Sequence, residues 1–155
     1  MVASLGDYHR LVTLHRPIGI LILILAAIRL ITRLVTRAPA LPPNVPRAER
    51  FVIKASEQLL YTLFIALPLV GWAMLSAGHF PIVMFGSVHL PPILPAKPEL
   101  YATLRETHTI LAYLLFGAFL AHFGAVLFHT LVLRDGLLNR MLPWTVRAAE
   151  GESRT

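Results

Sequence analysis

The sequence predicts an all-α integral membrane protein, a helical bundle in which three transmembrane helices are visible. Of its 155 residues, 56% are hydrophobic, only 14% are charged, and the mean hydropathy is +0.68. Soluble domains carry about 25% charged residues, so this apolar excess belongs in a membrane. Three stretches are long enough to cross a bilayer, and the second and third contain no Asp, Glu, Lys or Arg.

The first predicted span covers residues 18–35 and contains Gly19 followed by a run of Ile and Leu. In lipid, every backbone polar group must be satisfied within its own segment, so this run forms a helix. Arg29 and Arg33 lie one turn apart on its later half. Two interpretations stay open for them: the guanidinium groups extend toward the lipid headgroups, or they bind an anion such as a haem propionate.

The second predicted span covers residues 59–77, and a loop at 78–107 separates it from the third. This loop is too rich in proline for a helix and too apolar for a disordered linker, so we expect it to fold back over the helix ends. Its two histidines, His79 and His89, are expected at the surface. A histidine pair without carboxylates or cysteines has weak geometry for a closed metal site.

The third predicted span, residues 108–133, carries His108, His122 and His129. At 100° per residue, His122 and His129 lie only about 40° and 60° from His108 around the helix, so all three share one face. Fourteen residues rise about 21 Å, which places His108 and His122 near opposite edges of a hydrocarbon core. Histidine also serves as an interhelical hydrogen-bonding residue in membranes, but three on one stripe favour metal ligation.

His15 is the histidine that best matches His108 in depth. It precedes the first span as His108 opens the third, and both spans run in the same direction across the membrane. Gly19, one turn later, leaves a notch where a flat macrocycle could approach the backbone. The chain contains no cysteine, which excludes covalent haem attachment and leaves histidine as the ligand.

The net charge of +6 indicates membrane topology rather than nucleic acid, because the basic residues are neither interleaved with aromatics nor gathered on a soluble face. Lys97 and Arg105 are the only basic residues of the loop at 78–107. More flank the other ends of the spans: Arg37, Arg47, Arg50, Lys54, Arg134, Arg140, Arg147 and Arg154. The positive-inside rule therefore places the C-terminal tail, residues 134–155, in the cytoplasm and the N-terminus outside. The first 14 residues lack the apolar stretch of a cleavable signal peptide.

Several segments together resemble the bacterial cytochrome b-561 family, four-helix membrane cytochromes with two b haems. The resemblance runs from about Asp7 to Trp144 as one membrane domain. It rests on Leu14-His15-Arg16-Pro17-Ile18-Gly19, Ala66-Leu67-Pro68-Leu69-Val70-Gly71-Trp72, His108 with Leu111-Ala112-Tyr113 and His122, and Arg134-Asp135-Gly136-Leu137-Leu138 through Met141-Leu142-Pro143.

The resemblance implies that His15 and His108 hold an outer haem and that His122 holds an inner one against a histidine of the family's first helix. That helix would precede Met1. Three explanations stay open: a truncated gene product, which we favour, a partner helix that supplies the ligand, or a single outer haem. His129 lies about 10 Å below His122 on the same helix, so the two cannot share an iron. His129 is expected to make a boundary hydrogen bond or a propionate contact.

Two filled axial positions prevent substrate binding at the iron, so we expect a transmembrane electron carrier of the bacterial inner membrane. The resemblance adds a quinone as redox partner. Two haems are expected from the family, whereas the ligand pairs in this chain support one. Two alternatives remain: a haem-binding anchor subunit of a larger oxidoreductase such as a hydrogenase or formate dehydrogenase, and a helical membrane protein without haem.

Overall fold

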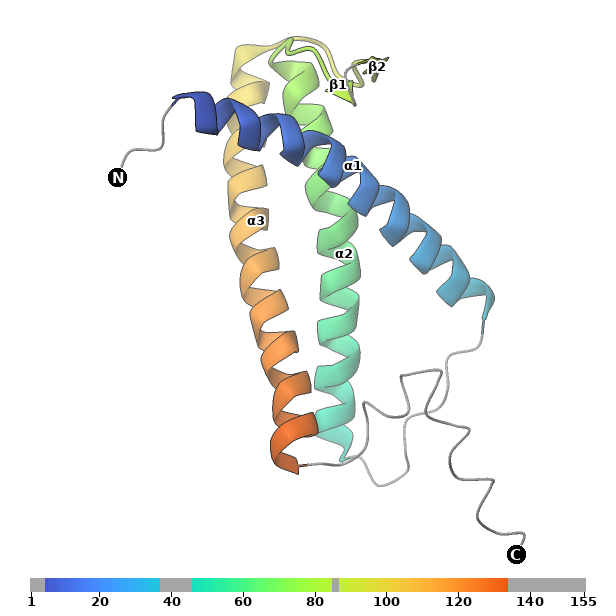
Figure 1. The fold of residues 1–155 in the computed structure, drawn as a ribbon. Coiled ribbons are helices and arrows are strands. Elements are labelled where there is room, and N and C mark those ends of the chain that lie inside the picture. The colour runs from blue at the N-terminus through green and yellow to red at the C-terminus, as the bar shows by residue number, and fades with distance from the viewer. Residues whose placement is uncertain (1–4, 37–45, 85–86, 134–155) are drawn as a thin grey trace, which may run out of the picture. The chain divides into compact units, whose positions relative to one another are not determined.

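The computed structural model describes residues 5–36, 46–84 and 87–133 (Figure 1). In chain order the elements are α1 (Leu5–Val35), α2 (Arg47–Ala77), β1 (Val83–Met84), β2 (Val88–His89), α3 (Pro98–Leu127) and a π-helical segment, η1 (Phe128–Leu133). The chain divides into two compact units, Met1–Phe116 and Gly117–Thr155. The predicted cytoplasmic tail at 134–155 and residues 37–45, between α1 and α2, lie outside the described residues.

Each long helix begins earlier than the apolar span that predicted it. α1 begins at Leu5, α2 at Arg47 and α3 at Pro98. The hydropathy pattern marks the part of a helix suited to hydrocarbon, whereas polar residues continue the helix beyond it. The expectation that all of the loop at 78–107 is too proline-rich for a helix was wrong for residues 98–107. Pro98 takes the first helical position, where the missing N–H has no partner to lose.

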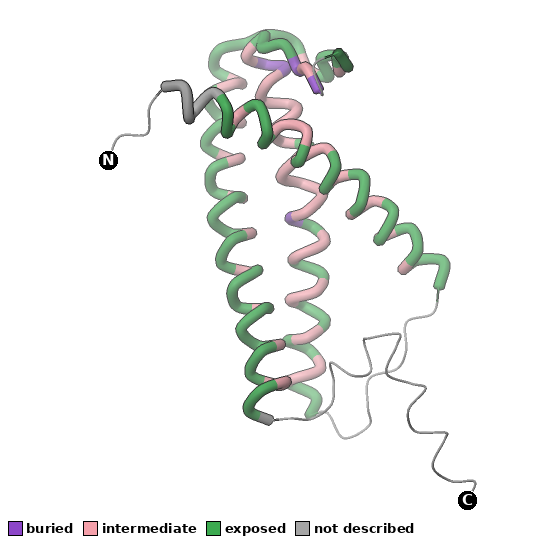
Figure 2. The backbone as a smooth tube through the Cα atoms, viewed as in Figure 1, coloured by how far each residue is buried: buried purple, intermediate pink, exposed green. Residues whose placement is uncertain are grey.

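The long helices present apolar side chains outward. No described residue of α1 or α3 is buried, and large side chains such as Leu25 (56% exposed) and Phe116 (63% exposed) lie on their surfaces (Figure 2). Such surfaces suit lipid rather than water. Three stretches are long and apolar enough to cross a membrane: Arg10–Val35, Arg47–Ala77 and Pro98–Val132. The predicted all-α membrane class is confirmed, apart from one two-stranded hairpin.

That hairpin belongs to a cap, which we define as residues 78–84 and 87–97. β1 and β2 pair antiparallel, with Val83 opposite His89 and Met84 opposite Val88. Ile82 and Met84 are buried, as is Ala77, the last residue of α2, and Figure 2 shows buried segments at the cap end of α2. The cap therefore folds back on the helix end, as its composition predicts.

Hydrogen bonds fix the cap to α2. The Trp72 indole Nε1 donates to the Pro91 carbonyl at 3.0 Å, and the Ile93 N–H donates to the Ser76 hydroxyl at 3.1 Å. The Lys97 N–H donates to the Ala77 carbonyl at 3.0 Å, directly before α3 begins. These bonds determine where α3 starts relative to the end of α2.

α1 joins the same region from another part of the sequence. It packs against α2, and its Arg16 donates from Nη1 to the Pro81 carbonyl of the cap at 3.2 Å. The neighbouring residue, His15, contacts α3. Three helices and the cap meet at this end of the first unit.

Candidate functional site

His15 of α1 and His108 of α3 lie next to each other in the structure. Their ring centroids are 6.2 Å apart, and the ring planes are inclined by 84°. His15 is exposed and His108 is half-buried. The sequence predicted this pair from matching depth, and the structure brings the two side chains together across 93 positions of the chain.

The separation of the two rings fits two imidazoles on opposite sides of one iron. Metal–nitrogen bonds of about 2 Å, with about 1 Å from each nitrogen to its ring centre, place two such centroids about 6 Å apart. Axial ligation leaves each ring free to rotate about its bond to the metal, so an inclined pair is compatible with it. The same distance also suits an edge-to-face aromatic pair. The surroundings of the rings are therefore needed to distinguish haem ligation from simple packing.

His108 has an unusual environment for a histidine that only packs. Its Nδ1 is buried and makes no hydrogen bond among the described residues. A buried imidazole nitrogen without a hydrogen-bond partner lowers stability, and such unpartnered polar atoms often occur at functional sites. The chemistry of this donor set, two histidines without cysteine or carboxylate, suits haem iron.

Two glycines border this histidine pair. A Cβ atom placed on Gly19 would meet no other atom within 4 Å, so the predicted notch on α1 is open. A Cβ placed on Gly71 of α2 would lie 3.0 Å from Cε1 of His108, closer than ordinary packing. Gly71 was not among the predicted site residues. The signal available in the sequence was a glycine close after Pro68 within an apolar span.

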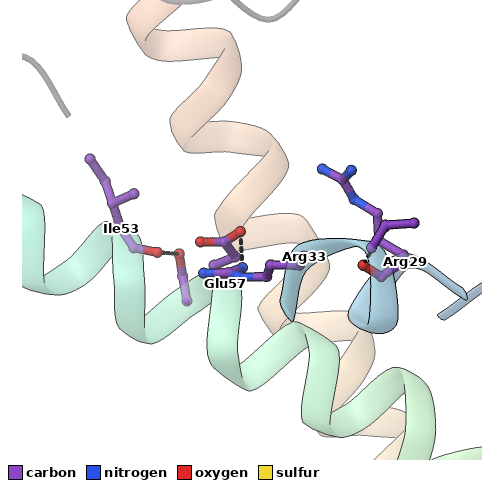
Figure 3. Close-up of polar contacts among 6 residues, drawn as sticks. Arg29, Arg33, Ile53 and Glu57 are labelled. Carbon is purple, nitrogen blue, oxygen red and sulfur yellow. Dashed lines mark hydrogen bonds and ion pairs between the residues drawn. The ribbon is translucent and has the colours of Figure 1, made fainter. Parts of the chain in front are cut away.

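The two predicted arginines of α1 differ in their surroundings (Figure 3). Arg33 forms an ion pair with Glu57 of α2, and its guanidinium lies 5.2 Å from the ring centroid of Tyr61. Arg29 is exposed and points away from that pair. Arg33 therefore has a carboxylate of the protein as its partner, which favours a role in joining α1 to α2 over propionate binding.

His122 and His129 belong to the second unit. Near His122 on α3, the rings of Phe119 and Phe123 stack with centroids 5.8 Å apart. His129 lies in η1, with its ring 6.2 Å from that of Phe128. Across residues 5–36, 46–84 and 87–133, no group of three or more His, Cys, Asp or Glu side chains is placed to hold a metal ion.

The two cap histidines lie at the surface. His79 and His89 are both exposed. His79 has a positive φ of 56°, which directs the chain out of α2 into the cap. Nδ1 of His89 lies 3.1 Å from the Ser87 carbonyl.

Comparison with known proteins gives consistent matches. The family model of prokaryotic cytochrome b561 matches residues 1–144. A probable superoxide oxidase CybB from Yersinia pestis is 34% identical over 133 residues, which make up 84% of this chain and 73% of that protein. Cytochrome b561 homologs 1 and 2 of Escherichia coli K12 are 29% and 28% identical, covering 83% and 88% of this chain and 73% of each relative. The family match includes the whole segment that contains the histidine pair, Gly71 and His122.

Proposed function

The chain belongs to the prokaryotic cytochrome b561 family, and on that premise we propose that His15 and His108 are the two axial ligands of one haem. The protein is a multi-pass membrane protein that binds haem b and transfers electrons, and its apolar helices contact lipid. The observation that carries the proposal is the 6.2 Å separation of the two rings beside a buried, unpartnered nitrogen.

Bound haem b supplies a one-electron couple between ferric and ferrous iron. The residues of this chain determine how that couple is used. His15 and His108 would hold the haem iron from both sides of the site, which would leave no place for a substrate at the iron and would restrict the site to electron transfer. The apolar faces of the helices around them exclude water, and the cap fixes the helix ends that carry the ligands.

His122 is proposed as a ligand of a second haem at the opposite side of the membrane. Its position fourteen residues after His108 corresponds to about 21 Å of helix, which suits transfer along the membrane normal. None of the other histidines is predicted at this depth, so the opposite ligand would come from a helix outside this sequence, either one that precedes it or one of a partner. His129 is proposed as a boundary residue and not as an axial ligand.

The distribution of basic residues and the apolar surface of the helices indicate where the protein lies in the cell and which redox partner it has. We place the protein in a bacterial inner membrane with the cap and the histidine pair outside, because basic residues flank the opposite ends of the spans. A quinone in the bilayer is the proposed redox partner, since it carries electrons in the same apolar phase as the helices. A redox protein docked outside the membrane is the other class of partner that this topology allows.

A second candidate function is the oxidation of superoxide, which would donate electrons at the cap end. Two observations favour it: the name of one relative and the position of Arg16. The Yersinia pestis relative is named a probable superoxide oxidase. In this chain Arg16 lies beside His15 and offers positive charge near the proposed haem. Superoxide would lose one electron and leave as dioxygen, with two such electrons and two protons converting a quinone to a quinol.

The first test is the number of haems per polypeptide in the detergent-purified chain, measured by a pyridine haemochrome assay. A ratio of about one with a low-spin spectrum is expected if the histidine pair alone is complete in the isolated chain. A ratio of about two would mean that oligomerisation completes the site at His122. A colourless protein would overturn the proposal. Reduction by superoxide, compared between the unsubstituted chain and Arg16→Gln, then tests the donor.

A further inference from the structure

Gly71 is the point at which α2 approaches the imidazole of His108. A Cβ built on Gly71 would lie 3.0 Å from Cε1, 3.3 Å from Nδ1 and 4.0 Å from Nε2 of that ring. The Cε1–Nδ1 edge therefore faces the backbone of α2, and Nε2 is the nitrogen farther from it. Any side chain at position 71 would occupy the space that this edge of the ring needs.

We propose that Gly71 is a positioning residue for His108, holding the ring so that Nε2 is the iron-binding nitrogen. This proposal rests on the proposed function, in which His108 is an axial ligand. Nδ1 is buried against α2, whereas Nε2 is not among the buried, unpartnered atoms of the described residues. A ligating imidazole coordinates through one nitrogen, and the surroundings of the other fix its tautomer and orientation.

The backbone of α2 also carries a carbonyl group beside the ring of His108. The Leu67 carbonyl, one turn before Gly71, lies close enough to the His108 imidazole to interact with it. The absence of a side chain at Gly71 leaves room for the ring to lie close to this stretch of the α2 backbone. Gly71 thus controls both the position of the ring and its access to this carbonyl.

Comparison with other glycines of the long helices separates this role from general helix packing. Glycine in membrane helices commonly allows two backbones to approach each other. A Cβ on Gly19, Gly117 or Gly124 would meet nothing within 4 Å, whereas the atoms nearest to Gly71 all belong to one imidazole. Of these four glycines, only Gly71 bears on a proposed ligand.

The first experiment compares Gly71→Ala with Gly117→Ala, the same substitution on a membrane helix with open space around it. Haem content and the electron paramagnetic resonance spectrum of the oxidised protein are measured. In Gly71→Ala we expect the low-spin signal from the histidine pair to shift, or to be replaced by a high-spin signal, because the ring must move away from the new methyl group. In Gly117→Ala it should be unchanged. A Gly71→Ala spectrum identical to that of the unsubstituted protein would overturn the proposal.

A second experiment avoids the possibility that the Gly71→Ala protein cannot accommodate the His108 side chain. In a His108→Gly background the imidazole is gone, so an alanine at position 71 meets no clash. Free imidazole is then titrated as a replacement ligand, followed by the haem absorbance. We expect Gly71→Ala to weaken imidazole binding by about tenfold in this background, since the added methyl occupies part of the vacated space. Gly117→Ala should leave the affinity unchanged, and equal affinities in all three backgrounds would contradict the proposal.

Failure of this inference is distinguishable from failure of the proposed function. If His15→Ala and His108→Ala abolish the haem signal while Gly71→Ala alters nothing, the ligand assignment stands and the positioning role does not. If neither histidine substitution affects haem, the ligand assignment fails first.

Discussion

The two ends of the first unit are joined by different kinds of contact. At the cap end, the Trp72 and Ser76 side chains of α2 form hydrogen bonds with backbone groups of the cap, and His15 meets His108. At the opposite end, α1 and α2 are linked through Arg33 and Glu57, whose side chains are 32% and 39% exposed. One end is built from short bonds to the backbone, the other from long, partly exposed side chains.

This difference explains why the proposed haem ligands lie at the cap end. A ligand site must hold its groups within a fraction of an ångström, which requires support whose own conformations are fixed by packing. Long charged side chains lose conformational entropy when they pair and contribute little net free energy. The Arg33–Glu57 pair can orient α1 on α2, whereas the cap can fix the position of an imidazole.

The largest expected effect comes from removing either histidine of the pair. His15→Ala or His108→Ala should abolish the haem absorbance of the cap-end site, because loss of one axial ligand opens the iron and weakens haem retention. The absorbance is measured in reduced-minus-oxidised difference spectra. The matched control is His89→Ala, which removes an exposed cap histidine and should leave the spectrum intact. Unchanged spectra in both pair variants would refute the ligand assignment.

A smaller effect is expected from Ser76→Ala, which tests the support supplied by the cap. Ser76 is buried, and its hydroxyl accepts from the Ile93 N–H. Leaving the Ile93 N–H without an acceptor should lower the free energy of unfolding by about 1–3 kcal/mol. The loss is detected as a lower midpoint of thermal unfolding in detergent.

The control for Ser76→Ala is Thr62→Ala, whose exposed hydroxyl bonds within α2 to the Gln58 carbonyl. It should change the midpoint much less. Equal shifts in the two variants would mean that the cap contributes no special rigidity.

At the opposite end, separating Arg33 from Glu57 should cost less. A double-mutant cycle with Arg33→Ala and Glu57→Ala is expected to give a coupling free energy below about 1 kcal/mol, because the two side chains are partly exposed. Unfolding in detergent measures the coupling, with Arg29→Ala as the control for loss of positive charge. A coupling free energy several times larger would show that the Arg33–Glu57 pair also contributes substantially to stability.

The smallest effect is expected from His129→Ala. As a boundary residue in η1, His129 should contribute nothing to haem content, so the haem-to-protein ratio should stay at its unsubstituted value. His122→Ala is the comparison variant, and it should lower the haem-to-protein ratio in preparations that contain the second haem. Loss of haem in His129→Ala alone would reverse the roles of these two histidines.

The sequence predicted the apolar centre of each helix but not the helix ends. Hydropathy defines which residues tolerate lipid, and it carries no information on how far polar residues such as Arg47 extend a helix into the interface. The mistaken assignment of residues 98–107 to a loop shows the same limit. Counting prolines overlooks that Pro98 is compatible with a helix when it comes first.

The histidine pair was predictable because depth in a membrane is a simple function of sequence. Position along a helix gives height at 1.5 Å per residue, so His15 and His108 could be matched without knowing how α1 and α3 pack. Gly71 could not be found in this way. Whether a glycine faces an imidazole or open space depends on the rotation of α2 about its own axis.

Composition and hydropathy therefore determined the class of this protein, its three long apolar helices and the shared depth of its proposed ligands, because these depend on the free energy of transferring each segment into lipid. The tertiary structure decided which side chains meet. It seated the cap on α2, paired Arg33 with Glu57 and placed Gly71 against His108, because such contacts depend on helix rotation and packing, which local sequence does not specify.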